Sequence, residues 1–105
     1  MRERIDTVIT EARGMLDRAY GDRLAGVVLF GSHARDAEPG SDVDLLVVLR
    51  GDVSATTEVS RLSGALAELS LRHDIVVSCA FVSEERYRSE QSPFLLNVRR
   101  EGIAA

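Results

Sequence analysis

The sequence predicts a single domain over residues 1–105 of the α/β (α+β) class, in which helices pack on a small mixed β-sheet. Three short apolar runs are rich in Val, Leu and Ile, a composition typical of buried strands. Two longer stretches repeat apolar residues at the spacing of an amphipathic helix. One of these stretches connects the second and third runs, and it has the length that a crossover between parallel strands needs.

The first predicted element is a helix over residues 3–20. Its apolar positions follow the helical period and lie on one face: Ile5, Val8, Ile9, Ala12, Leu16 and Ala19. Gly21 follows as a candidate C-cap. The first strand is predicted over Leu24–Phe30, where "LAGVVLF" combines apolar and β-branched residues, and Gly31 ends it.

The second strand is predicted over Val43–Leu49, and because it is apolar on both faces we expect it in the centre of the sheet. A helix is predicted over residues 55–72, and a third strand over residues 74–82. The face of that helix repeats at helical spacing through four apolar positions: Val59, Leu62, Leu66 and Leu69.

Two short helices are predicted after the third strand. Ser83, followed by two glutamates, is a favourable helix start. A last helix over residues 92–102 is opened by Pro93 and stopped by Gly102. Its apolar residues can serve either the core or a docking surface, and the sequence leaves both open.

The composition excludes several classes of protein. Hydrophobic residues make up 45% and charged residues 29%, and the net charge is −4, which argues against nucleic acid as the main partner. The single cysteine, Cys79, permits no internal disulfide, so we expect a reducing, cytoplasmic setting. The longest apolar run is far too short to span a membrane, and no membrane role is expected.

Three carboxylates are predicted to gather at one edge of the sheet. Asp42 and Asp44 stand two positions apart at the start of the second strand, so their side chains point to one face. If the first two strands are antiparallel and the third is parallel to the second, Asp74 starts at the same edge. Crowded carboxylates repel one another unless a cation lies between them. Hard oxygen ligands suit Mg²⁺ or Mn²⁺, and two such ions can clamp a phosphoryl group.

Gly31 and Ser32 are candidates for binding phosphate at the same edge. Glycine has no Cβ, so its backbone can come close to a phosphate. Ser32 offers a hydroxyl and a backbone N–H at the start of a short predicted helix. Together with the carboxylates, this pattern favours transfer of part of a nucleoside triphosphate.

The stretch "GSHARDAEPGSDVDLLV" resembles the signature of the polymerase-beta-like nucleotidyltransferase superfamily, in which Gly-Ser is followed about ten residues later by Asp-x-Asp. The opening "GSHAR" and the ending "SDVDLLV" of this stretch are similar to those of the minimal nucleotidyltransferase (MNT) domains. The resemblance covers nearly the whole chain. It implies the nucleotidyltransferase fold. It also implies that Asp42 and Asp44 hold two Mg²⁺ ions and that Asp74 binds one of them and helps deprotonate the attacking hydroxyl.

The resemblance further implies that Gly31 and Ser32 bind the triphosphate of ATP, with Arg35 and Ser41 shaping the loop. MNT proteins are typically antitoxins encoded beside a HEPN-domain ribonuclease toxin, and members transfer AMP from ATP to a tyrosine of that toxin. The implied protein is therefore a cytoplasmic, magnesium-dependent protein adenylyltransferase that acts in a hetero-oligomer with its toxin.

Two departures from the family pattern keep other functions open. Nine residues separate Ser32 from Asp42, where ten are commoner, and Asp36 stands where a glycine often follows "AR". The first alternative is an antitoxin that neutralises its toxin by binding alone. The second is a subunit that transfers a nucleotide to a small molecule of the aminoglycoside type.

Overall fold

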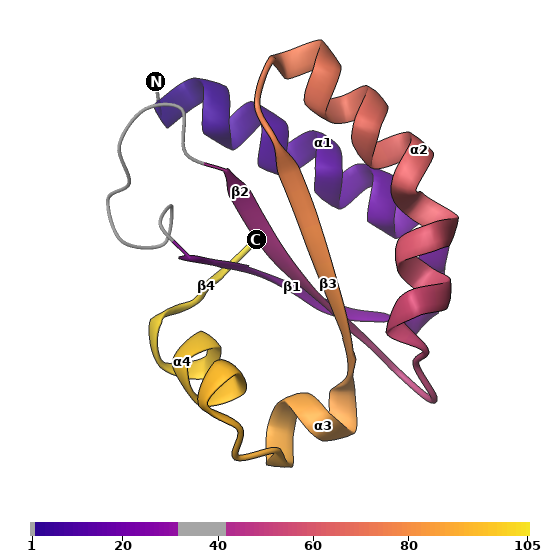
Figure 1. The fold of residues 1–105 in the computed structure, drawn as a ribbon, viewed down its shortest axis with the longest axis vertical. Coiled ribbons are helices and arrows are strands. Elements are labelled where there is room, and N and C mark those ends of the chain that lie inside the picture. Colours follow the sequence, from indigo (N-terminus) through magenta and orange to yellow (C-terminus); the bar gives the residue numbers. More distant parts are fainter. Residues whose placement is uncertain (1, 32–41) are drawn as a thin grey trace.

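A computed structural model of the chain describes residues 2–31 and 42–105, and the structural statements below concern these residues. The elements run in the order α1 (Arg2–Tyr20), η1 (Gly21–Arg23), β1 (Leu24–Phe30), β2 (Val43–Leu49), α2 (Ala55–His73), β3 (Val77–Ser83), α3 (Glu84–Ser89), α4 (Pro93–Glu101) and β4 (Ile103–Ala104), as Figure 1 shows. No helix in this part of the chain has the length and apolar content needed to cross a membrane.

The four strands form one mixed sheet in the order β3-β2-β1-β4. Strand β1 is antiparallel to β2 and to β4, whereas β2 and β3 are parallel. The predicted mixed sheet with β2 in its interior is therefore confirmed. The topology brings the end of β1 and the starts of β2 and β3 to the same edge of the sheet (Figure 1).

Each face of the sheet carries its own helices. Helices α1 and α2 cover one face, and α4 covers part of the other, with α3 beside it (Figure 1). The predicted inner face of α1 is confirmed, because Val8, Ala12 and Leu16 are fully buried. The prediction for α2 was wrong at one position: Val59 is 45% exposed, and the neighbouring Glu58 is buried instead.

Glu58 is buried because polar groups surround it. The Tyr20 hydroxyl donates a 2.7 Å hydrogen bond to its carboxylate, and Arg23 and Arg61 each approach the carboxylate to 3.7 Å. Burial, and then the contact with Glu58, raise the pKa of the Tyr20 phenol well above its usual value. The cluster ties the end of α1 to the start of α2. In the sequence it is indicated only by the spacing of Glu58, which lies four residues before Leu62 and therefore on the same face of the helix.

The third strand begins later than the sequence predicts. The expected strand started at Asp74, but α2 continues to His73 and Asp74 caps it in the left-handed region, with a φ of 51°. The Asp74 N–H donates to carbonyls in the last turn of α2. The pairing of β3 with β2 begins where β2 begins. There the Val43 N–H donates a 2.8 Å hydrogen bond to the Val76 carbonyl, just before β3. The first residue of β2, Val43, is in register with Val77, and β3 accordingly starts there.

Contacts at the C-terminal end of α4 anchor it to α3 and, through β4, to the sheet. The Arg99 guanidinium donates to the Tyr87 and Glu90 carbonyls at 2.5 and 2.7 Å, which ties α4 to α3. After α4, the Gly102 N–H donates to the Val98 carbonyl at 2.8 Å, and the chain then pairs with β1 as the short strand β4. A Cβ on Gly102 would lie 2.5 Å from that carbonyl oxygen and would also overlap the side chain of Val28.

We predict that Gly102→Ala lowers the free energy of unfolding by about 1–3 kcal/mol, because the added methyl has no room between α4 and β1. Urea denaturation measures this change. The control is Gly64→Ala on the exposed side of α2, where a Cβ meets nothing within 4 Å. That variant should gain about 0.5–1 kcal/mol through helix propensity. Equal stability of the two variants would show that the tight approach at Gly102 does not exist.

Candidate active site

The edge shared by β1, β2 and β3 carries a close contact between a glycine and a carboxylate. Gly31 follows β1 with a φ of +75°, a conformation that side chains with a Cβ rarely adopt. A Cβ placed on Gly31 would lie 2.6 Å from Oδ2 of Asp44. The position therefore needs glycine twice over, once for its backbone conformation and once for the space that the carboxylate occupies.

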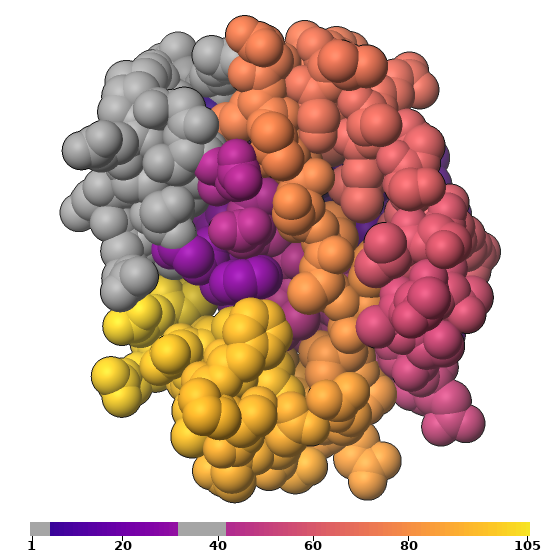
Figure 2. Space-filling model, viewed as in Figure 1, coloured from indigo at the N-terminus to yellow at the C-terminus, as the bar shows by residue number. Residues whose placement is uncertain are grey.

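Strand β2 aims Asp44 at the less covered face of the sheet. Val43 and Leu45 pack in the core under α1 and α2, so alternation puts Asp44 on the opposite face with Leu46 and Val48. Side chains of α4 cover Leu46 and Val48, whereas Asp44, nearer the strand start, is half-buried. Figure 2 shows that part of β1 and β2 stays visible between α4 and β3.

The neighbours of Asp44 across the sheet are Phe30 on β1 and Ser78 on β3. Phe30 is the register partner of Asp44 and directly precedes Gly31, so the end of β1 lies next to Asp44. Ser78 is exposed and contributes a hydroxyl at the level of Asp44. This edge therefore combines a carboxylate, a hydroxyl and an aromatic side chain.

The other two predicted carboxylates lie at the same edge but in different settings. Asp42 is exposed and directly precedes β2, with the fully buried Val43 between it and Asp44. Asp74 is exposed in the turn between α2 and β3. Over residues 2–31 and 42–105, no three His, Cys, Asp or Glu side chains converge on one point that could hold a metal ion. The structure thus brings Gly31 and Asp44 together, and Asp74 lies in the turn before β3, the strand that pairs with β2.

The donor chemistry nevertheless fits a magnesium ion that arrives with a nucleotide. Mg²⁺ in such sites usually takes one or two carboxylates, and substrate phosphates and water complete its coordination shell. Asp42 and Asp44 supply two carboxylates at one strand start. The remaining predicted site residues, Ser32, Arg35 and Ser41, lie outside the residues that the structure describes.

His73, next to Asp74, has a structural contact. Its Nε2 lies 2.5 Å from the Glu11 carboxylate, and this hydrogen bond holds the pKa of Glu11 below its usual value. The contact ties the end of α2 to α1, and it thereby fixes the helix end that Asp74 caps. Cys79 is partly buried and packs against the core, and burial raises the pKa of its thiol to about 12.

Comparison with known proteins identifies the family. The sequence profile of the nucleotidyltransferase domain matches residues 9–100, which is most of the chain and includes the whole edge described above. The chain belongs to the nucleotidyltransferase domain family. It is accordingly an enzyme of the nucleotidyltransferase class, and the predicted mixed sheet and nucleotidyltransferase fold are confirmed.

Two relatives come from Methanocaldococcus jannaschii, and each is provisionally named a protein adenylyltransferase. MJ0604 is 31% identical over 99 residues, which covers 92% of this nucleotidyltransferase and 93% of the relative. MJ0141 is 32% identical over 72 residues, covering 68% and 72%. A chain in the crystal structure of a mutant toxin–antitoxin MntA-HpeT has the same fold, with a TM-score of 0.55 at 16% identity, over 90% of this chain and 69% of that one.

Proposed function

We propose that this nucleotidyltransferase is an antitoxin that transfers AMP from ATP to a tyrosine of a HEPN-domain ribonuclease toxin and so neutralises it. The observation that carries the proposal is the contact of Gly31 with the Asp44 carboxylate at the open sheet edge. Both relatives are named for adenylyl transfer to proteins, and the structural neighbour comes from a toxin–antitoxin complex. These similarities support a protein acceptor supplied by a partner chain.

The edge suits the nucleotide chemically. The absence of a Cβ at Gly31 lets the end of β1 approach the Asp44 carboxylate closely, so a phosphate held by the Gly31 backbone would lie near that carboxylate. Two carboxylates in sequence, Asp42 and Asp44, would repel a bare triphosphate, so they require the divalent cations that accompany ATP. When bound, Mg²⁺ would stabilise the negative charge on the phosphate oxygens in the transition state, and Asp42 and Asp44 would hold the ion.

The proposed reaction is an in-line displacement at the α-phosphorus of ATP. The tyrosine oxygen forms a bond to that phosphorus, and the bond to the bridging oxygen of the β-phosphate breaks. Pyrophosphate leaves, and the phenol proton passes to a base, for which Asp74 remains the candidate. The half-exposed setting of Asp44 leaves the edge open to an acceptor from another protein.

The test uses the chain together with the product of the neighbouring gene. Radiolabelled ATP is supplied with Mg²⁺, carrying the label on the α-phosphate in one reaction and on the γ-phosphate in the other. We expect the partner to acquire the α label and not the γ label, and we expect EDTA to abolish the transfer. Mass spectrometry then locates the AMP, and Tyr→Phe at that position of the partner should prevent labelling.

Other outcomes separate the alternatives. Tight binding to the partner without any label would favour an antitoxin that acts by binding alone. Label on an added aminoglycoside, with none on the partner, would favour a small-molecule nucleotidyltransferase. Transfer of the γ label would show a phosphoryl transfer and would overturn the proposal.

A further inference from the structure

A hollow lies beside the proposed phosphate position, between the end of β1 and helix α4. Its volume is about 340 Å³, and it is lined by Phe30, Gly31, Phe94, Asn97, Val98 and Glu101. Gly31 is shared between this hollow and the contact with Asp44. A molecule bound at Asp44 can therefore extend into the hollow without leaving the surface of the protein.

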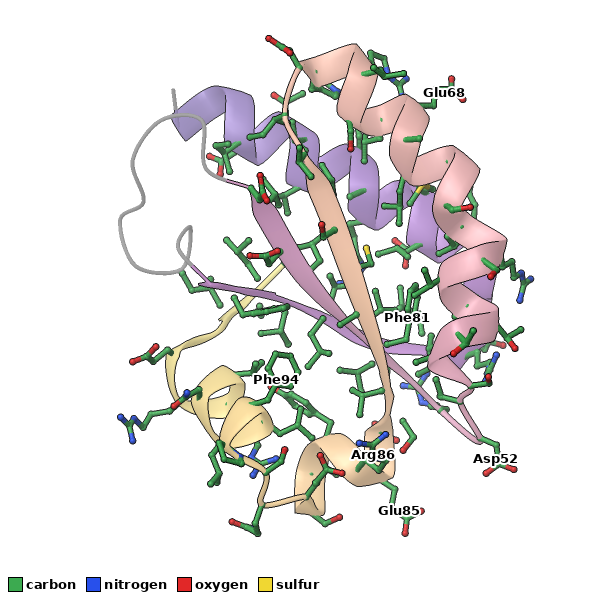
Figure 3. The ribbon with its side chains drawn as sticks, viewed as in Figure 1. Asp52, Glu68, Phe81, Glu85, Arg86 and Phe94 are labelled. Carbon is green, nitrogen blue, oxygen red and sulfur yellow. The ribbon has the colours of Figure 1, made fainter. Side chains whose placement is uncertain are left out.

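One wall of the hollow is aromatic. The rings of Phe30 and Phe94 meet edge to face, with centroids 5.3 Å apart at 84°. Phe94 projects from α4 toward the sheet in Figure 3, yet it remains 46% exposed. A large, partly exposed aromatic side chain in a concave site is a surface on which a flat ring can stack.

A polar group lies one helical turn from Phe94. Asn97 follows it at i+3 on α4, so the two side chains are neighbours on the helix surface. Its amide offers a donor and an acceptor side by side, and no hydrogen bond to it comes from the part of the chain that the structure describes. Among the lining residues only Glu101 is charged, and its negative charge disfavours a phosphate in the hollow.

We propose that this hollow binds the adenine base of the ATP whose phosphates lie at Gly31 and Asp44, an inference that rests on the proposed function. In ATP only the ribose separates the α-phosphate from the base, which matches the shared wall at Gly31. The Asn97 amide can pair with adenine N6 and N7 together, whereas guanine presents two acceptors at those positions. Phe94 and Phe30 supply the apolar stacking surface, and Asn97 sets the preference for adenine.

The experiment measures binding of ATP, GTP and inorganic tripolyphosphate to the full chain by calorimetry in the presence of Mg²⁺. For Asn97→Ala we expect about tenfold weaker binding of ATP, loss of the preference for ATP over GTP, and unchanged binding of tripolyphosphate. Phe94→Ala should weaken both nucleotides about tenfold. Leu96→Ala is the matched control, because Leu96 is a 44% exposed residue of α4 that does not line the hollow, and it should change none of these values.

Two results would overturn the inference in different ways. If Asn97→Ala and Phe94→Ala keep the affinity and base preference of the wild type but lose transfer to the partner, the hollow receives the acceptor side chain and the proposed function still holds. If the wild type binds neither ATP nor tripolyphosphate and transfers no nucleotide, the proposed function fails and the base site fails with it. Because Asn97 is exposed, its replacement leaves folding intact, and circular dichroism verifies this for each variant.

Discussion

The Asp44→Asn variant is expected to lose nucleotide transfer by roughly 10²- to 10³-fold, which corresponds to about 3–4 kcal/mol of transition-state stabilisation. The amide has nearly the shape of the carboxylate, so the packing against Gly31 is preserved. What the variant loses is the negative charge that attracts a divalent cation. Transfer of α-labelled AMP to the partner toxin, measured under single-turnover conditions, gives the size of the effect.

The control for Asp44→Asn lies at the other end of the same strand. Asp52 is an exposed carboxylate in the loop after β2, far from the candidate site in Figure 3. Asp52→Asn makes the same chemical change and should leave transfer within twofold of the wild type, since surface substitutions away from a site have small effects. Equal transfer rates for the two variants would show that the Asp44 carboxylate plays no part in the reaction. Asp74→Asn in the same assay decides whether that carboxylate takes part, and the family resemblance implies that it does.

Gly31→Ala is expected to reduce transfer about 10²-fold and to lower the free energy of unfolding by about 1–2 kcal/mol. The stability loss follows from the φ of +75°, which costs an alanine more than a glycine. The loss of activity follows from the contact, because a methyl 2.6 Å from Asp44 Oδ2 forces the carboxylate to move. Urea denaturation and the labelled-AMP assay, run on the same preparation, measure the two effects separately.

Gly21→Ala separates the backbone effect from the contact. Gly21 also has a positive φ, of 53°, but a Cβ there meets nothing within 4 Å. This variant should lose a similar amount of stability and keep its activity. If Gly31→Ala behaves like Gly21→Ala in both measurements, the close approach to Asp44 plays no part in catalysis.

Much of the fold was predictable because helices and strands each impose a short, regular spacing on apolar residues along the sequence. The bounds of β1 and β2 agree with prediction, and the inner face of α1 was predicted from its apolar spacing. Ser83 and Ser92 each cap the following helix through a side-chain hydrogen bond, as short-range capping rules lead one to expect. The two-residue strand β4 escaped prediction, because it carries no pattern of its own and forms by pairing with β1.

By itself the sequence determined the types of the longer elements, the mixed sheet and the residues, Gly31 and Asp44 among them, that chemistry and family resemblance single out. Only the tertiary structure decided that a Cβ at Gly31 has no room beside Asp44, that Asp74 caps α2 ahead of β3, and that Asn97 of α4 lines a hollow next to Gly31. The physical reason is the range of the interactions. Helical and strand periods involve residues a few positions apart, whereas register and helix docking are set by contacts between segments that are distant along the chain.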